Sequence, residues 1–334
     1  MSSKKTIWFK RIFALLIAGL LLNGFCYFYY NPTAYVLEDS RSTDVIREPF
    51  AFTARAKEGF AYSTMDANGY NNAFVPKEGE IFALMMGASH TEGMNVMQDE
   101  NTSSQLNALL AKDNVNGYAY NIGISNHYLD KNAANLRNAL ERFRPTDYVV
   151  IETHSLEFST KTIENAINNN VAQISETRIP LPSITGQPIF KTLYKQFMAL
   201  TTKTGASSSA AVFDDFERYE LLLTQLFTQM KQTADEYGVE LIIYYHPHLR
   251  LLEDGSAIAN TNAAYCSAFS QACENAGVIF LDMANDFLEA YENEYILPHG
   301  FANTSAGSGH LNRNGCKMIA QALYEIMLDK ESAQ

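Results

Sequence analysis

EIFALMMGASHTEG, residues 80–93, places a run of apolar residues directly before a glycine-flanked turn that carries Ser89. Short apolar runs of this kind are typical of buried strands in a parallel sheet. In an open sheet of this class, ligands bind at the turns that follow the carboxyl ends of the strands. The stretch therefore predicts a strand over residues 80–86 and an exposed hydroxyl group at the edge of a sheet.

Further apolar runs follow along the chain, and helical patterns alternate with them. We predict strands over residues 80–86, 117–122, 148–153, 241–245 and 278–281, and helices over 102–112, 130–143, 160–172, 214–237, 260–276 and 312–329. Strands that alternate with helices indicate a parallel sheet with crossover helices. The predicted class is α/β with a five-stranded parallel sheet.

The rest of the chain divides into smaller parts. We predict a basic tail over residues 1–11, a membrane anchor over 12–30, a stalk over 31–46 and a main domain over 47–334. FAFTARAKEGFAYST alternates around Lys57-Glu58-Gly59, which indicates a short hairpin against the main domain. Residues 179–212 interrupt the strand and helix pattern and are long for a connection, so we expect a cap over the carboxyl edge of the sheet.

The amino-terminal stretch predicts a single transmembrane helix. No charged residue occurs from Ile12 to Leu37, and nineteen mostly apolar residues span a bilayer core of about 30 Å. Basic residues precede it, so the positive-inside rule places the main domain outside the cytoplasm. A cleaved signal peptide is the alternative, but the aromatic residues 27–30 offer no small-x-small cleavage site.

Charge argues against nucleic acid as a partner. The chain has 25 basic and 37 acidic residues, for a net charge of −12. All four basic residues of the tail (Lys4, Lys5, Lys10 and Arg11) precede the apolar helix, which leaves 21 basic residues against all 37 acidic ones beyond it. A nucleic-acid-binding domain needs a basic face for the phosphates, and this balance does not provide one.

A histidine near the other end of the chain could serve Ser89 as a base. A nucleophilic serine needs one, and GHLNRNG, residues 309–315, places His310 in a loop before the last predicted helix. The two motifs resemble those of the SGNH (GDSL-type) hydrolases. That family has a first block G-D-S-x-T-x-G and a last block with a histidine before Leu-Asn-x-x-Gly, and the resemblance covers most of the chain beyond residue 80.

The resemblance implies a three-layer α/β/α flavodoxin-like fold and a serine hydrolase that cleaves esters. It implies that Ser89 attacks the substrate and that His310 takes the serine proton. A further block, YNIGIS over residues 120–125, resembles the family's asparagine-x-glycine segment. By resemblance, the backbone N–H groups of Gly123 and Ser89 would bind the oxyanion, and no cofactor is implied.

Three positions depart from the family. Ala88 replaces the aspartate that braces the serine turn, so we expect a rebuilt turn without loss of chemistry. The family's third block supplies an asparagine to the oxyanion hole, whereas here Thr153, His154 or Ser155 would have to donate. Gly307 occupies the position of the family's triad acid. Either a main-chain carbonyl orients His310, or Glu152 replaces the missing acid, or catalysis is weak or lost.

The other histidines do not indicate a metal site. His246-Pro247-His248 follows the fourth predicted strand, but two histidines without a third ligand make a poor zinc site. We expect His127 and His299 in surface loops, and we predict no metal.

These observations predict a membrane-anchored, extracytoplasmic serine esterase. An outward-facing enzyme meets cell-surface glycans first, so O-acetyl or similar acyl groups on such glycans are the expected substrates. One alternative is an O-acetyltransferase that passes the acyl group from the same serine to a sugar hydroxyl. Another is a non-catalytic glycan-binding envelope protein, which the missing aspartate and asparagine would favour.

Overall fold

Five parallel strands form the central sheet of the computed structural model, which describes residues 2–31, 35–37, 45–168, 188–190, 192–194 and 216–331. They are β5 (Ile81–Met86), β6 (Tyr118–Asn121), β7 (Tyr148–Thr153), β8 (Glu240–Tyr245) and β11 (Ile279–Asp282). The spatial order is β11-β8-β7-β5-β6. This is the flavodoxin-like order, whose switch point lies between the first and third strands, here β5 and β7. The predicted fold class is confirmed.

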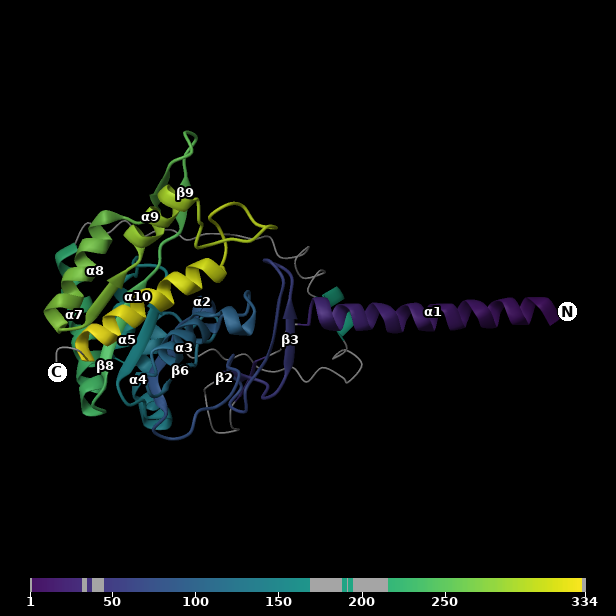
Figure 1. The fold of residues 1–334 in the computed structure, drawn as a ribbon, viewed down its shortest axis with the longest axis horizontal. Coiled ribbons are helices and arrows are strands. Elements are labelled where there is room, and N and C mark those ends of the chain that lie inside the picture. Colours follow the sequence, from purple (N-terminus) through teal and green to yellow (C-terminus); the bar gives the residue numbers. More distant parts are fainter. Residues whose placement is uncertain are drawn as a thin grey trace.

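Helices cover both faces of the sheet and make three layers (Figure 1). One face carries α4 (Leu129–Phe143), α5 (Thr160–Ile167), α7 (Phe216–Glu236) and α8 (Ala263–Ala276), and the other carries α3 (Thr102–Lys112), α9 (Ala284–Glu294) and α10 (Arg313–Glu331). Successive side chains of a strand point to opposite faces. In β7, Val149 belongs to the core under α4, α7 and α8, whereas Val150 belongs to the core under α3, α9 and α10. Both faces are therefore buried, which explains the continuous apolar runs.

The predicted strands and helices agree closely with the structure, although some elements were missed. Helix α9 was not predicted, because ANDFLEAYENE has four acidic residues and only a short apolar stripe. The antiparallel pair β9 (Leu249–Leu251) and β10 (Ala257–Ala259) was not predicted either. Helix α5 ends at Ile167, short of the predicted residue 172, and residues 169–187 lie outside the described ones. The predicted cap over 179–212 lies almost entirely outside them as well.

The predicted hairpin is confirmed. Strands β3 (Phe52–Arg55) and β4 (Ala61–Thr64) pair antiparallel, and Glu58 lies in the turn between them. The side chains of Thr53 and Ser63 are buried toward the main domain, where the Ser63 hydroxyl contacts Met94 Sδ at 3.8 Å. The face of the hairpin that carries small polar residues packs toward the main domain. The opposite face carries aromatic residues and is the outer side of the hairpin.

The apolar amino-terminal segment forms α1 (Ser2–Tyr29), which projects away from the domain in Figure 1. Its residues Thr6–Tyr29 are long and apolar enough to cross a membrane, a property that a signal sequence shares. The predicted stalk contains two short paired strands, β1 (Tyr35–Leu37) and β2 (Val45–Arg47). The division into tail, anchor, stalk and main domain stays a prediction.

Candidate active site

Ser89 lies at the start of a short helix directly beyond β5. This helix, α2 (Ser89–Glu92), ends at Gly93, whose φ of 66° is left-handed. The turn before it needs glycine at position 87, because a Cβ there would lie 2.1 Å from Thr91 Oγ1 and 2.6 Å from Glu152 Cβ. The tight approach of β5, α2 and β7 thus fixes the backbone on which Ser89 is carried.

His310 lies next to Ser89, as the two motifs predict. The Ser89 hydroxyl is 2.9 Å from His310 Nε2, although 221 residues separate them. The His310 carbonyl accepts from the Gly300 N–H at 3.0 Å, and His299 pairs with Leu311 in an isolated β-bridge. These bonds hold the histidine loop ahead of α10 and above the end of β5.

The acid beside His310 is Glu58, from the turn of the β3–β4 hairpin. Its Oε2 lies 2.8 Å from His310 Nδ1 and also accepts the His310 backbone N–H at 2.9 Å. The hydrogen bond from the His310 side chain lowers the pKa of Glu58 to about 2, so the carboxylate is ionised at neutral pH. An ionised acceptor keeps a proton on Nδ1 and leaves the Nε2 lone pair facing the serine hydroxyl.

Contacts at both ends of the hairpin turn hold Glu58 in place. Asn303 Oδ1 accepts from the Gly59 N–H at 2.6 Å, and Asn303 Nδ2 donates to the Lys57 carbonyl at 3.2 Å. Gly59 has a φ of 66°, and a Cβ there would lie 2.5 Å from the Phe301 ring. These contacts join the turn that carries Glu58 to the loop that carries His310, although the two segments lie far apart in the sequence.

Glu152 does not contact His310, so the prediction that it replaces the triad acid is wrong. One of its oxygens accepts from the Ala88 N–H at 2.6 Å and from the Thr91 hydroxyl at 3.3 Å. The other lies 3.1 Å from His246 Nε2 and 3.3 Å from His154 Nδ1. The carboxylate is directed to the amide of residue 88, so Glu152 braces the serine turn where the family uses an aspartate.

The buried Glu152 carboxylate stays ionised. Burial opposes its ionisation, but hydrogen bonds and charge from His154 and His246 outweigh that cost and hold its pKa well below the ordinary value. The pKa of His154 is raised in turn. Burial alone would lower this pKa, but the hydrogen bond to Glu152 and the charge of its carboxylate outweigh burial. The site therefore holds a fixed negative charge beside the serine turn, and this charge raises the pKa of His154.

We expect Glu152→Gln to destabilise the fold by about 3 kcal/mol, because the amide keeps one acceptor oxygen where the carboxylate uses two, and its NH2 group replaces an acceptor in a buried network. Urea unfolding with a common slope for both proteins measures the change. The matched control is Glu157→Gln, since Glu157 is exposed and lies near the same strand end. A loss below about 1 kcal/mol, as for an ordinary surface substitution, would contradict the bracing role.

Two of the five predicted oxyanion donors are engaged elsewhere. The Gly123 N–H donates to Asn121 Oδ1 at 2.8 Å, and the Thr153 hydroxyl donates to the Ser155 carbonyl at 2.6 Å. Each prediction is corrected by a local acceptor within two residues. Ser89, His154 and Ser155 remain: the Ser89 N–H is at the start of α2, where helix amides have no intrahelical acceptor, and the Ser155 hydroxyl accepts from the Glu157 N–H at 3.2 Å.

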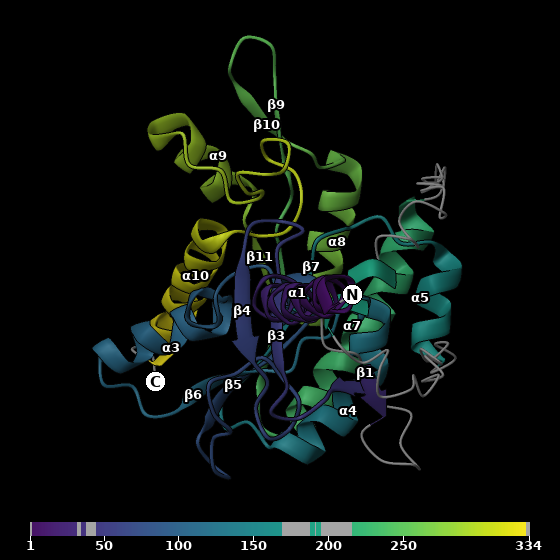
Figure 2. The same cartoon turned by 90° about the vertical axis from the view of Figure 1, so that its right-hand side faces the viewer.

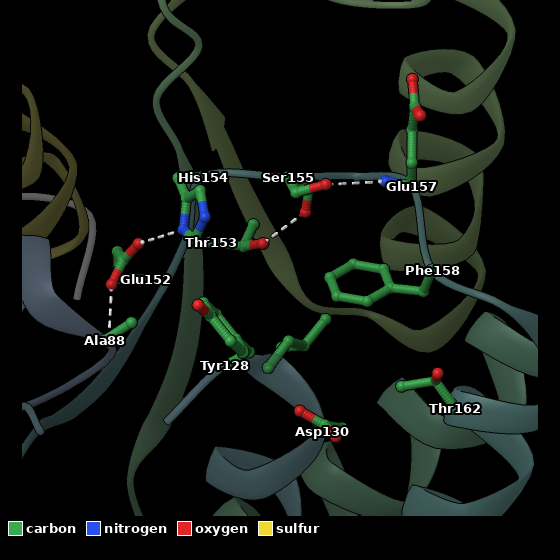
Figure 3. Close-up of a pocket in the computed structure, with 11 residues that line it drawn as sticks. Ala88, Tyr128, Asp130, Glu152, Thr153, His154, Ser155, Glu157, Phe158 and Thr162 are labelled. Atoms are coloured by element: carbon green, nitrogen blue, oxygen red, sulfur yellow. Dashed lines mark hydrogen bonds and ion pairs between the residues drawn. The ribbon is translucent and has the colours of Figure 1, made fainter. Parts of the chain in front are cut away.

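A pocket of about 260 Å³ lies beside the serine turn (Figure 3). Its wall includes Ala88, Tyr128, His154, Ser155, Phe158 and Thr162. In Figure 3, dashed lines join Glu152 to both Ala88 and His154, so the turn and the pocket share one carboxylate. Apolar and polar side chains both line the pocket, as is common in sites that bind small molecules.

The buried histidines behind the site form a hydrogen-bonded chain. His246 Nδ1 and His299 Nε2 are 3.2 Å apart, and both rings are almost fully buried. His299 was expected in a surface loop, and this is wrong, because its ring is 1% exposed and stacks on His246. Burial lowers the pKa of both imidazoles, which keeps them neutral.

Nitrogen atoms of His90, His246 and His299 lie within 4.8 Å of one another, as ligands of a metal ion could. However, His90 Nδ1 accepts the Leu311 N–H at 3.1 Å, which requires the proton of a neutral His90 ring to be on Nε2. Neither nitrogen of that ring then offers a free lone pair. Only two imidazoles are left, fewer than the three protein ligands of a catalytic zinc site.

Gly307, where the family has its triad acid, cannot hold an acid in this loop. Its φ is 71°, and a Cβ would lie 2.6 Å from the Leu249 carbonyl oxygen. Its own carbonyl lies 3.3 Å from His248 Nδ1. The acid beside His310 therefore comes from outside this loop, from Glu58, 252 residues before His310. No spacing in the sequence could connect these two residues.

Comparisons with known proteins add structural likeness only. Models of protein families give no match, and neither do curated proteins. Among solved structures, TesA is 14% identical over 73% of this chain and 96% of its own, with a TM-score of 0.40. Axe2, an acetyl xylan esterase from Geobacillus stearothermophilus, is 15% identical over 75% and 95%, with a TM-score of 0.41.

A protein from Slackia heliotrinireducens, whose name assigns it provisionally to the SGNH hydrolases, is 16% identical over 75% of this chain and 100% of its own, with a TM-score of 0.41. The chain resembles the SGNH hydrolases. The sequence blocks around Ser89 and His310 lie where that resemblance implies, at the carboxyl edge of β5 and ahead of α10. The function that follows rests on the geometry of this site.

Proposed function

We propose that the chain is a serine hydrolase that cleaves esters through a triad of Ser89, His310 and Glu58. One observation carries the proposal: Ser89 Oγ, the His310 ring and Glu58 Oε2 form a continuous line of hydrogen bonds of 2.9 and 2.8 Å. Such a line makes a weak nucleophile reactive. A protein that only bound glycan would have no need of it.

The reaction follows from these positions. Ser89 Oγ forms a bond to the ester carbonyl carbon while its proton passes to His310 Nε2, and Glu58 stabilises the imidazolium. The carbon–oxygen bond to the alcohol then breaks, and His310 returns the proton to the leaving oxygen. Water attacks the acyl-enzyme by the same route and releases the acid and free Ser89. The Ser89 N–H is the donor proposed for the oxyanion, and His154 is the second proposed donor when its ring carries both protons.

The proposed setting is the outer surface of a membrane. α1 would anchor the chain, and the basic residues before it would keep the tail in the cytoplasm. The proposed substrates are O-acetyl or similar acyl esters on cell-surface glycans, since the pocket of about 260 Å³ that Ala88, the residue before Ser89, helps to line suits a small acyl group.

A fluorophosphonate probe tests the proposal, because it labels an activated serine. We expect the full-length protein to be labelled at Ser89, with labelling lost in Ser89→Ala and strongly slowed in His310→Ala. Mass spectrometry of the labelled peptide locates the adduct. Ser308→Ala is the matched control, since Ser308 is exposed in the histidine loop. Absence of labelling at Ser89 in the folded protein would contradict the proposal.

A further inference from the structure

Aromatic side chains surround the junction of α1 with the hairpin. Tyr27 stacks on Phe52 with ring centroids 5.0 Å apart, and Tyr29 stacks on Phe60 at 5.9 Å. Phe60 in turn contacts Tyr62 at 6.3 Å. We call these residues, together with Phe28, the aromatic belt. It joins the end of the proposed anchor to the element that carries Glu58.

The hairpin residues of the belt point away from the main domain. Phe60 and Tyr62 are 50% and 47% exposed, whereas Ala61 and Ser63 between and beside them are buried. On α1, Phe28 is 65% exposed. Large exposed apolar patches mark surfaces that contact a partner or a membrane. Rings with one apolar body and, in tyrosine, one polar tip are enriched where a membrane meets water.

The orientation of the hairpin places this outer side at the foot of α1. Figure 1 shows β3 running across the axis of the helix, and Figure 2, viewed along α1, shows β3 and β4 behind the helix end. The junction is fixed by an antiparallel bridge, in which the Asn31 N–H donates to the Ala54 carbonyl at 2.8 Å and Ala54 donates back at 3.1 Å. A bilayer that contains α1 would therefore meet the outer side of the hairpin.

A second segment adds exposed apolar side chains at the same place. The Ile189 N–H donates to Asn23 Oδ1 at 3.2 Å, and the Thr192 hydroxyl lies 3.3 Å from the Tyr30 carbonyl. Next to these contacts, Phe190 is 44% exposed and Leu193 is 58% exposed. Apolar groups from three stretches of chain thus gather around the last turns of α1.

We propose that the aromatic belt lies in the headgroup region of the bilayer that holds α1, so that Ser89 acts on esters presented at the membrane surface. The proposal deepens the proposed function and rests on it for the chemistry. Phe60 lies two residues after Glu58, so a bilayer contact at Phe60 would hold the turn that carries Glu58 close to the membrane surface. The substrates would then be acyl esters on membrane-bound carriers, such as lipid-linked glycans.

Fluorescence quenching by brominated lipid tests the contact without any need for activity. Trp8 is the only tryptophan, so Trp8→Phe provides a dark full-length background. Phe60→Trp, Tyr62→Trp and Tyr295→Trp are added one at a time, and each protein is reconstituted into phosphatidylcholine vesicles with or without brominated acyl chains. Tyr295 is the matched control, because it is 77% exposed and ends α9, which Figure 1 shows far from α1.

We expect bromination to remove about half or more of the emission from Phe60→Trp and Tyr62→Trp, because interfacial rings reach about 5–10 Å into the headgroup and acyl boundary. Tyr295→Trp should be unaffected. Equal emission in both lipids at positions 60 and 62 would overturn the proposal. Quenching without esterase activity would leave the bilayer contact intact and contradict the proposed function instead.

A second arm measures the consequence for substrate. In vesicles, the double variant Phe60→Ser/Tyr62→Ser should hydrolyse a water-soluble acetyl ester at the rate of the unchanged chain but an acetyl ester carried on a bilayer lipid several-fold more slowly. Unequal loss on the two substrates supports presentation at the membrane. Equal rates on the lipid ester would overturn the substrate class.

Discussion

Glu58→Gln is expected to lower kcat/KM for a small acetyl ester by about four orders of magnitude, the loss known for the corresponding change in a serine protease triad. The glutamine amide carries no charge, and where its NH2 group faces His310 Nδ1, that nitrogen has to accept and the ring proton moves to Nε2. The imidazole then loses the tautomer that accepts the serine proton, and the imidazolium loses its partner. Steady-state hydrolysis of the ester measures the effect.

The matched control for this variant is Lys57→Gln. Lys57 is exposed in the same turn, and its side chain has no place in the proposed triad. Its rate should stay within about twofold of the unchanged chain, as for a surface substitution away from the site. A loss of less than about tenfold in Glu58→Gln would show that a carbonyl or solvent suffices to orient His310.

Ser89→Ala is expected to abolish turnover of the same ester to the background of the assay, because no acyl-enzyme can form without Oγ. The free energy of unfolding should change by about 1 kcal/mol or less, since only the hydrogen bond to His310 is lost. Activity and urea unfolding of the same preparation separate the two effects. Residual acyl-enzyme turnover in Ser89→Ala would require another nucleophile.

Acid should affect Glu58 only at low pH. The folded pKa of about 2 lies below the ordinary value of 4.5, so the carboxylate contributes stability that is fully present above about pH 4.5. That contribution is lost as the pH falls from there through about 2. Loss of activity between pH 5 and 7 would therefore not be due to protonation of Glu58.

The strands and the serine and histidine motifs could be predicted because they are local. Apolar runs report burial on both faces of the sheet, and the glycines around Ser89 report a tight turn. The hairpin was predicted from its alternation, and Glu58 was visible at its tip. What the sequence could not provide was the docking of that tip on the histidine loop, which depends on Asn303 and Phe301.

For Glu152, the sequence predicted the location at the site but not the role. Its place at the end of β7 made it the nearest acid in the predicted topology, and the structure does place it at the site. Which groups a buried carboxylate meets depends on the packing of α2 against β7 and on side-chain direction, and neither follows from strand order. Its acceptor role toward the Ala88 N–H became apparent only from the contact at 2.6 Å.

A double-mutant cycle tests the central claim that Glu58 acts through His310. Four proteins are compared by kcat/KM on one acetyl ester: the unchanged chain, Glu58→Gln, His310→Ala and the double variant. Because members of a triad act as a unit, we expect the double variant to be no slower than His310→Ala. If the two losses instead multiplied, Glu58 would act independently of His310, and the triad drawn from the hairpin would be contradicted.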